Sequence, residues 1–517
     1  MYFEKSFPED QGISTLAIKN FLTNIKKANI ELHSYMIIRH SKIIDEGYFY
    51  PYAKDIEHMM YSISKTFVSL AIGFLIDENK LKLDDFVIPF FKEIDFSNKP
   101  YFNQLKIKHL LSMTTGIKEE PNFLFNSDWI KTYFNMEIIH TPGTVFKYIN
   151  MNSYILSVII CRISGETLID FLYQRLFVKL DIEKPSWDKC PKGYEVGGWG
   201  LFLKTEDLAK VTDLLLHDGS NHYNITIIPE FWIRELLTYH VDTSKHTNKQ
   251  KDYLNGYSYG LWRGNDKTSF RLDGIYGQFA FVFKELNVVI VTTASYYLSY
   301  KIIDLIFEDL IPYFIDETLS FHADYYRQLM HLNKDLSLIK NINPYRSTYE
   351  IAINNITYHF KRKTIGFIPF MIQGSKGSFN SGPNYFRLTF FSSYLNIIWH
   401  EYNQEINLSA GLKNEVLYHD IKINQSEYRI GCYAYFENNS RLIIIVYFLS
   451  YPHSRKIVID FYTSNRCLVS FIEVPDINLV IDYYAKNIMS IRYKKINYFV
   501  LESLYSLIDR SSIAFKK

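Results

Sequence analysis

A serine and a lysine stand three residues apart at the start of a long apolar segment, in Tyr61-Ser62-Ile63-Ser64-Lys65-Thr66-Phe67. Residues three apart lie on the same face of a helix, so Lys65 would sit one turn beyond Ser62. If burial kept the lysine amine neutral, it could take the serine proton, and the serine could then attack a carbonyl carbon. The spacing alone carries little weight, because Ser337-Leu338-Ile339-Lys340 repeats it with no other candidate chemistry nearby.

The segment after this pair predicts the helix that must position it. From Phe67 to Ile76 the residues are apolar except for the small Ser69 and Gly73, and Asp77-Glu78-Asn79-Lys80 closes the run. This pattern is typical of a helix that is buried on most sides. Ser62 would lie at its amino end, where the helix dipole and unpaired backbone N–H groups favour the negative charge of an oxyanion.

The surrounding chain predicts an α+β fold. We expect a helix over residues 13–28, strands over 34–39 and 42–50, a mostly helical stretch over 80–215, strands over 277–283 and 288–294, and a closing helix over 298–313. Strands that are distant in sequence would then share one antiparallel sheet, which is flanked by helices and interrupted by a large helical insertion.

Beyond about residue 340 the sequence changes to short runs rich in Tyr, Phe, Ile and Val, separated by Asn, Gly, Ser and Pro. This pattern predicts a second, antiparallel β domain. We therefore expect two domains, residues 1–320 and residues 341–517, with the boundary between Ile315 and Asn341.

A second candidate motif lies in Pro142-Gly143-Thr144-Val145-Phe146-Lys147-Tyr148-Ile149-Asn150, which contains Tyr-x-Asn. The triplet occurs elsewhere in the chain, for example at Tyr101-Asn103, so it is uninformative alone. Preceded by Pro-Gly-Thr and placed downstream of a Ser-x-x-Lys helix, it resembles the second motif of the class C β-lactamase and penicillin-recognising serine hydrolase family.

Further segments in the family's order extend this resemblance over roughly residues 5 to 315. They are Glu9–Ser14, Leu32–Ser34 with Arg39-His40, His109–Gly116, Gly197–Leu201 and Glu206–Ala209. The most similar subgroup contains 6-aminohexanoate-dimer hydrolase and related esterases. The resemblance implies a β-lactamase/transpeptidase-like fold for the first domain, and the second resembles accessory β domains of some of these hydrolases.

The family's third motif is usually Lys-Thr-Gly on an edge strand beside the nucleophile. The best positional match here is Gly274-Ile275-Tyr276-Gly277-Gln278, in which Ile275 replaces the cationic residue. Lys267-Thr268-Ser269 is closer in spelling, but it precedes the expected strand and lacks the glycine. Loss of the lysine removes an anchor for a substrate carboxylate, so we expect a neutral or different substrate rather than a β-lactam.

The resemblance implies three catalytic residues. Ser62 would be the nucleophile, Lys65 its general base or proton shuttle, and Tyr148 the group that delivers a proton to the leaving group. The reaction would pass through an acyl-enzyme that water then hydrolyses, without a metal ion or an organic cofactor.

The resemblance also implies the residues that would bind the substrate. Asn150 would hydrogen-bond the substrate or Lys65, and Tyr276 and Gly277 would border the substrate. The backbone N–H groups of Ser62 and Gln278 would form the oxyanion hole, in which the loss of one donor typically costs about two to three decades in rate.

The composition narrows the classes of partner. The 517 residues carry a formal net charge of +2 from 57 basic and 55 acidic residues without a basic stripe, which argues against nucleic acid. The amino terminus lacks a secretory signal, no apolar run reaches the roughly 18 residues that span a bilayer, and the four cysteines are scattered. We expect a cytoplasmic protein with a small amide or ester substrate and no membrane partner. The oligomeric state stays open.

Three functions are compatible with these residues. The leading one is a serine amidase or esterase that acts on a small acyl substrate. The second is a peptidoglycan-directed D,D-peptidase or β-lactamase, against which Ile275 and the missing signal argue. The third is a low-turnover binding protein that retains the fold. In each case we expect Trp199 and Trp262 to be packing residues.

Overall fold

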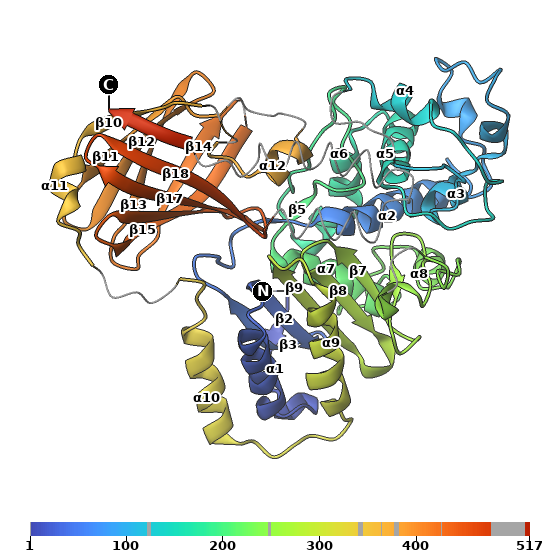
Figure 1. Cartoon of the computed structure of the whole chain (residues 1–517). Coiled ribbons are helices and arrows are strands. Elements are labelled where there is room, and N and C mark those ends of the chain that lie inside the picture. Colours follow the sequence, from blue (N-terminus) through green and yellow to red (C-terminus); the bar gives the residue numbers. More distant parts are fainter. Residues whose placement is uncertain are drawn as a thin grey trace. The chain divides into compact units, whose positions relative to one another are not determined.

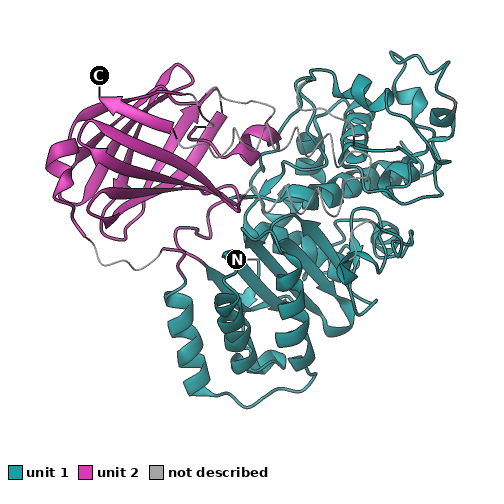
Figure 2. Ribbon diagram, viewed as in Figure 1, with its two compact units in different colours: residues 1–48, 57–336 teal, residues 49–56, 337–517 magenta. Residues whose placement is uncertain are grey.

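The computed structural model describes residues 2–120, 126–246, 250–339, 345–362, 364, 366–376, 382–424, 426–476 and 512–516. The chain divides into two compact units, residues 1–48 with 57–336 and residues 49–56 with 337–517 (Figure 2). The first unit therefore extends past residue 320 and omits one short internal segment. Residue 341, the predicted start of the second domain, and Lys340 of the second Ser-x-x-Lys sequence lie outside the described residues.

The internal segment 49–56 belongs to the second unit through its own contacts. The Tyr50 hydroxyl accepts a hydrogen bond of 2.8 Å from the backbone N–H of Val416. The Tyr52 ring packs edge-to-face on Tyr447, with 6.2 Å between the ring centroids. No local pattern in the sequence indicates this assignment, because both tyrosines follow directly on a strand of the first unit.

The first unit is built on one sheet with the strand order β1-β3-β2-β9-β8-β7-β6 (Figure 1). Its strands are β1 (Glu4–Lys5), β2 (Leu32–Arg39), β3 (Lys42–Tyr48), β6 (Trp262–Arg263), β7 (Phe270–Gly274), β8 (Gln278–Phe283) and β9 (Val288–Ala294). Only the β1–β3 pair is parallel. In the β2–β9 pair Met36 lies opposite Val291, so the expected sheet between distant parts of the chain is confirmed.

The helices of this unit cover the sheet and form the insertion. They are α1 (Thr15–Lys27), α2 (Ser64–Asp77), α3 (Ile107–Leu111), α4 (Trp129–Phe134), α5 (Asn150–Ser164), α6 (Leu168–Leu172), α7 (Thr205–Leu216), α8 (Glu230–Leu236), α9 (Tyr300–Asp309) and α10 (Ala323–Lys334). Side chains alternate between the faces of a strand. In β8, Phe281 and Phe283 contact Phe307 of α9, whereas Ala280 and Val282 belong to the core that α2 and α7 share.

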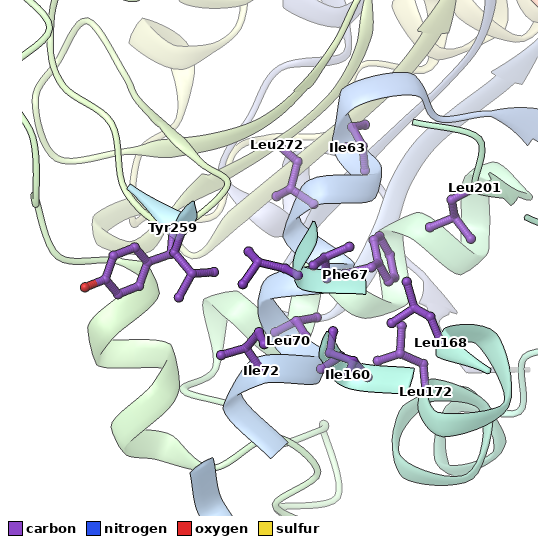
Figure 3. Packing of buried hydrophobic residues seen from close by; sticks show 14 of the residues in the cluster. Ile63, Phe67, Leu70, Ile72, Ile160, Leu168, Leu172, Leu201, Tyr259 and Leu272 are labelled. Atoms are coloured by element: carbon purple, nitrogen blue, oxygen red, sulfur yellow. The ribbon is translucent and has the colours of Figure 1, made fainter. Parts of the chain in front are cut away.

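Helix α2 is the centre of that core, as its apolar sequence predicts. All residues from Ser64 to Leu75 are buried, and Phe67 packs among side chains that include Leu168 (Figure 3). Each large apolar side chain that is fully buried contributes about 1.5–3 kcal/mol relative to exposure. At Gly73 a Cβ would come within 2.2 Å of the Trp232 indole, so only glycine fits there without moving the tryptophan.

The second unit is an antiparallel β domain, as predicted. Among the described residues its strands are β10 (Ile356–Phe360), β11 (Tyr385–Phe390), β12 (Tyr394–Glu401), β13 (Gln404–Gly411), β14 (Leu417–Ile423), β15 (Ser426–Asn438), β16 (Arg441–Phe448), β17 (His453–Thr463), β18 (Arg466–Val474) and β19 (Ser512–Lys516), with α11 (Tyr349–Ile353) and α12 (Phe370–Ser375) beside them. The order is β13-β12-β11-β10-β19-β18-β17-β16-β15-β14, and a parallel pairing between β13 and β15 closes the sheet on itself.

Two further observations bear on the expectations from composition. The four cysteines Cys161, Cys190, Cys432 and Cys467 are unpaired. Within the described ranges, none of the helices combines the length and the apolar character needed to cross a bilayer.

Candidate active site

Ser62 occupies a tight turn directly before α2. A short 3₁₀ turn, Tyr61–Ile63, leads into the helix, and the backbone N–H of Met60 is fixed by the carbonyl of Leu201 at 2.8 Å. Tyr61 has φ of 47°, a left-handed conformation that is uncommon for a residue with a large side chain. The predicted position of Ser62 at the amino end of a buried helix is therefore what the structure contains.

Lys65 meets Ser62 across one helical turn. Its Nζ atom lies 2.7 Å from Ser62 Oγ and 2.6 Å from the carbonyl oxygen of Gly198. The side chain is buried, and burial lowers the pKa of Lys65 to about 7, against the smaller opposing effects of Glu120 and Asp273. A substantial fraction of the amine is thus neutral near pH 7 and able to accept a proton.

Tyr148 completes a triad with these two residues. Its side chain interacts electrostatically with that of Ser62, and its ring centre lies 4.8 Å from Lys65 Nζ. Burial holds the pKa of Tyr148 well above its usual value, so the phenol stays protonated. Trp262 stacks on the Tyr148 ring with 5.8 Å between centroids, and Tyr257 meets the same ring edge-to-face. Trp262 is a packing residue, as expected, but the ring that it positions is Tyr148.

Asn150 is the first residue of α5, and its partner is one that sequence reasoning missed. The half-buried Glu120 accepts hydrogen bonds from the Asn150 backbone N–H at 2.7 Å, from Asn150 Nδ2 at 3.4 Å and from the Met151 N–H at 3.1 Å. Burial raises the pKa of Glu120 to about 7, while these bonds and Lys65 act in the other direction. The Asn150 side chain is therefore held by Glu120 rather than by Lys65.

The glycines of the third motif differ in what they face. A Cβ on Gly274, the last residue of β7, would come within 2.4 Å of the Met60 carbonyl oxygen, so Gly274 lets this strand approach the turn that carries Ser62. A Cβ on Gly277 would instead meet Ile302 at 2.6 Å, on a different side of the hairpin. The glycine that lets β7 approach the Ser62 turn is therefore Gly274, and the role of Gly277 beside the substrate stays a prediction.

Tyr276 and Gln278 are fully buried. The Gln278 amide donates to the carbonyls of Ile275 at 2.9 Å and Ala294 at 3.0 Å, and its oxygen accepts from the Ala294 N–H at 3.0 Å. The Tyr276 ring packs edge-to-face on Tyr61 at 5.6 Å. Both side chains hold the β7–β8 hairpin against its neighbours, and their contact with a substrate stays a prediction.

Two backbone donors next to the serine remain available. Within the described chain, the N–H groups of Ser62 and Ile275 donate to no backbone carbonyl. Ile275 follows Gly274 directly, and it is partly exposed. The hairpin thus presents the Ile275 N–H at the end of β7, three positions before the Gln278 N–H that the sequence suggested.

Asp273 adds a buried carboxylate at the same end of β7. Arg271 Nε donates to Asp273 Oδ2 at 2.8 Å, and both side chains are buried. Burial raises the pKa of Asp273, with Arg271 opposing that shift. The charge beside the site is therefore a compensated ion pair. Lys267 lies in the β6–β7 connection, outside β7.

No cluster of three or more His, Cys, Asp or Glu side chains suited to a metal ion occurs among the described residues.

Comparisons with known proteins identify the family of the first unit. The Beta-lactamase family profile matches residues 23–298. The chain is 21% identical over 290 residues to 6-aminohexanoate-dimer hydrolase of Paenarthrobacter ureafaciens, which covers 51% of this chain and 72% of that protein. It is 26% identical over 240 residues to Protein flp of Staphylococcus aureus strain MW2, covering 41% of this chain and 46% of flp, so it spans less than half of that relative.

Among solved structures, a penicillin-binding protein homologue from Caulobacter crescentus is 16% identical, with a TM-score of 0.47, and covers 57% of this chain and 97% of that one. The resemblance stated from the sequence motifs is confirmed by the family match.

Proposed function

Because this chain belongs to the Beta-lactamase family, we propose that it is a serine hydrolase that cleaves an amide or an ester through an acyl-enzyme on Ser62. The observation that carries this proposal is the 2.7 Å contact between Ser62 Oγ and the buried Lys65 Nζ. A pKa of about 7 for Lys65 supports its use as a general base near neutral pH.

In the acylation step, neutral Lys65 takes the hydroxyl proton of Ser62 as Oγ forms a bond to the substrate carbonyl carbon. The carbonyl oxygen becomes an oxyanion, and the bond from carbon to the leaving nitrogen or oxygen then breaks. Tyr148 interacts with the same serine side chain and stays protonated, so it can deliver a proton to the leaving group and regain one from Lys65.

The oxyanion donors that the geometry supports best are the N–H groups of Ser62 and Ile275. The approach of Gly274 to Met60 favours Ile275 over Gln278 as the second donor. Donors of this kind act because they are already oriented before the charge develops.

Deacylation repeats these steps with water as the nucleophile. A water proton passes to Lys65 while the water oxygen bonds to the acyl carbon, and the Ser62 Oγ–carbon bond then breaks and Oγ regains its proton. The carboxylic acid product leaves, and no other reactant is required.

A neutral small-molecule substrate fits the charges at β7. At the end of β7 no residue is equivalent to the family's cationic third-motif residue. Leu272 and Ile275 are apolar, and Arg271 forms an ion pair with Asp273. We therefore place amides and esters without a carboxylate anchor ahead of β-lactams and peptidoglycan peptides as substrates.

The test is labelling by a fluorophosphonate probe together with hydrolysis of nitrophenyl esters of increasing chain length. We expect an adduct on Ser62, found by intact mass and peptide mapping, and none in Ser62→Ala. Ser69→Ala is the matched control, since it makes the same change at a buried position on the same helix and should retain labelling. Unchanged labelling in Ser62→Ala would refute the proposal. A penicillin adduct on Ser62 would instead favour the D,D-peptidase or β-lactamase function.

A further inference from the structure

The carboxylate of Glu120 is built into the amino end of α5. Its Oε2 atom accepts from the Asn150 N–H and from Asn150 Nδ2, and Oε1 accepts from the Met151 N–H. The first N–H groups of a helix have no partner within the helix, and the helix dipole favours a negative charge there. Glu120 comes from a loop 30 residues upstream, so this cap is a tertiary contact rather than a local one.

A direct structural path joins this cap to Lys65. Lys65 Nζ donates to the carbonyl of Gly198 at 2.6 Å. Gly198 in turn lies against the first residue of α5, where an added Cβ would come within 2.7 Å of the Asn150 carbonyl oxygen and 3.4 Å of Asn150 Cβ. Glu120 fixes Asn150, Asn150 supports Gly198, and Gly198 holds the amine of Lys65.

We propose that Glu120 is a positioning residue of the hydrolytic site, which fixes the Asn150–Gly198 contact and stabilises the positive charge that Lys65 acquires when it takes the Ser62 proton. This inference rests on the proposed function. In the acylation step the proton moves from Ser62 Oγ to Lys65 Nζ, so the amine becomes an ammonium, and Glu120 acts on it in its ionised form, which predominates above its pKa of about 7. Glu120 exchanges no proton with the substrate and forms no bond to it.

The other charged groups around Lys65 leave this task to Glu120. Asp273 also acts on Lys65, but Arg271 already compensates its charge at 2.8 Å. Tyr148 is neutral in the working range because burial raises its pKa. On the far side, Lys147 interacts electrostatically with Glu120, but its side chain is exposed. Loss of the Glu120 charge would therefore lower the pKa of Lys65 further below its usual value.

The experiment compares Glu120→Gln with Glu119→Gln. Both variants remove one negative charge from adjacent positions, but only the first alters the carboxylate that caps α5. The rate of Ser62 labelling by a fluorophosphonate is followed from pH 5 to 9, because this reaction isolates acylation.

We expect the acid limb of the Glu120→Gln profile to move to lower pH by about 1 unit, since an opposite charge close to an amine raises its pKa by about that much. The plateau rate should fall about tenfold, because the ammonium loses its stabilising charge. Glu119→Gln should follow the wild-type profile. A purely structural cap would lower thermal stability without moving the limb.

A second measurement separates this inference from the proposed function. The ε-carbon resonance of Lys65 is titrated by NMR in ¹³C-lysine-labelled Ser62→Ala protein, with and without Glu120→Gln, and is assigned with Lys65→Arg. A lower Lys65 midpoint in the Glu120 variant supports the inference even if no substrate is turned over. Coincident midpoints overturn it, even if Ser62 forms an adduct in the wild-type protein.

Discussion

Two helices, α5 and α2, begin at the candidate active site, and only the amino end of α5 is capped by a side chain. Helix α5 starts with its first N–H groups bound to the carboxylate of Glu120. Helix α2 starts after a 3₁₀ turn with no side chain capping it, and Ser62 lies in that turn. Both ends favour negative charge for the same reason. The amino end of α5 is bound by the Glu120 carboxylate, and the amino end of α2 is open to the oxyanion of the proposed reaction.

The difference teaches how a hydrolase can hold two carboxylates near a nucleophile without losing its oxyanion site. Glu120 is bound to α5, and Asp273 is bound to Arg271. Both carboxylates are therefore occupied by other partners, and the Ser62 backbone N–H, in the turn before α2, stays available. The following predictions test this contrast, in decreasing order of the free energy involved.

Lys65→Met should abolish hydrolysis at Ser62, at the amino end of α2, while the fold is retained. Removal of a general base within hydrogen-bond reach of its nucleophile costs about two to four decades in rate. We expect a loss of about three decades in nitrophenyl ester hydrolysis, with a far-ultraviolet circular dichroism spectrum like that of the wild type. Activity within tenfold of wild type would mean that another group activates Ser62.

Lys65 should also give stability a pH dependence. Its folded pKa of about 7 lies below the ordinary lysine value of 10.5, so between these values the unfolded chain binds a proton that the folded chain does not. Stability from this group therefore rises with pH from about 7 to 10.5, by an amount on the order of a few kcal/mol. The Tm difference, wild type minus Lys65→Met, should increase across this window in calorimetry. A difference that stays flat would mean that Lys65 is not buried.

Gly274→Ala should push β7 away from the turn before α2 that carries Ser62. The new Cβ would come within 2.4 Å of the Met60 carbonyl oxygen, and overpacking of this kind costs about 1–3 kcal/mol. We expect a fall in kcat of about tenfold or more as the Ile275 N–H is displaced from the serine. Gly165→Ala is the matched control, because Gly165 has open space around it although its φ is positive. Equal kinetics in the two variants would return Gln278 as the preferred second donor.

Glu120→Ala should uncap the occupied end. Loss of a capping side chain typically costs about 1 kcal/mol, so thermal denaturation should show a small decrease in Tm. Glu119→Ala is expected to leave the Tm unchanged. If the two variants unfold alike, the hydrogen bonds to Asn150 and Met151 contribute no stability, and the two helix ends are less different than they look.

Local pattern was sufficient to bring Ser62 and Lys65 together. Ser62 lies in the 3₁₀ turn that leads into α2 and Lys65 in the first turn of that helix, so the three-residue spacing puts them on one face. Tyr148 required an ordered set of motifs, because its contact with Ser62 bridges 86 positions of loop and helix and no spacing rule governs it.

The sequence could not identify Glu120, or which glycine of the hairpin lies against the Ser62 turn. Glu120 reaches α5 from a loop whose path depends on tertiary packing, and glutamate at such a position has no distinctive neighbours. Gly274 and Gly277 are three residues apart, and either could end a strand. The choice depends on which strand meets the Ser62 turn, which is a property of the sheet register.

During synthesis, segment 49–56 is made long before the residues that it packs against. A ribosome releases chains from the amino terminus, yet Tyr50 and Tyr52 find their partners near Val416 and Tyr447, more than 300 residues later. During translation these eight residues must wait unassembled beside β3 and just before the serine turn. A chain truncated after residue 336 would therefore contain a first unit in which segment 49–56 lacks its packing partners. We expect chaperones to bind such a chain, or proteases to degrade it, because its unassembled segment stays exposed.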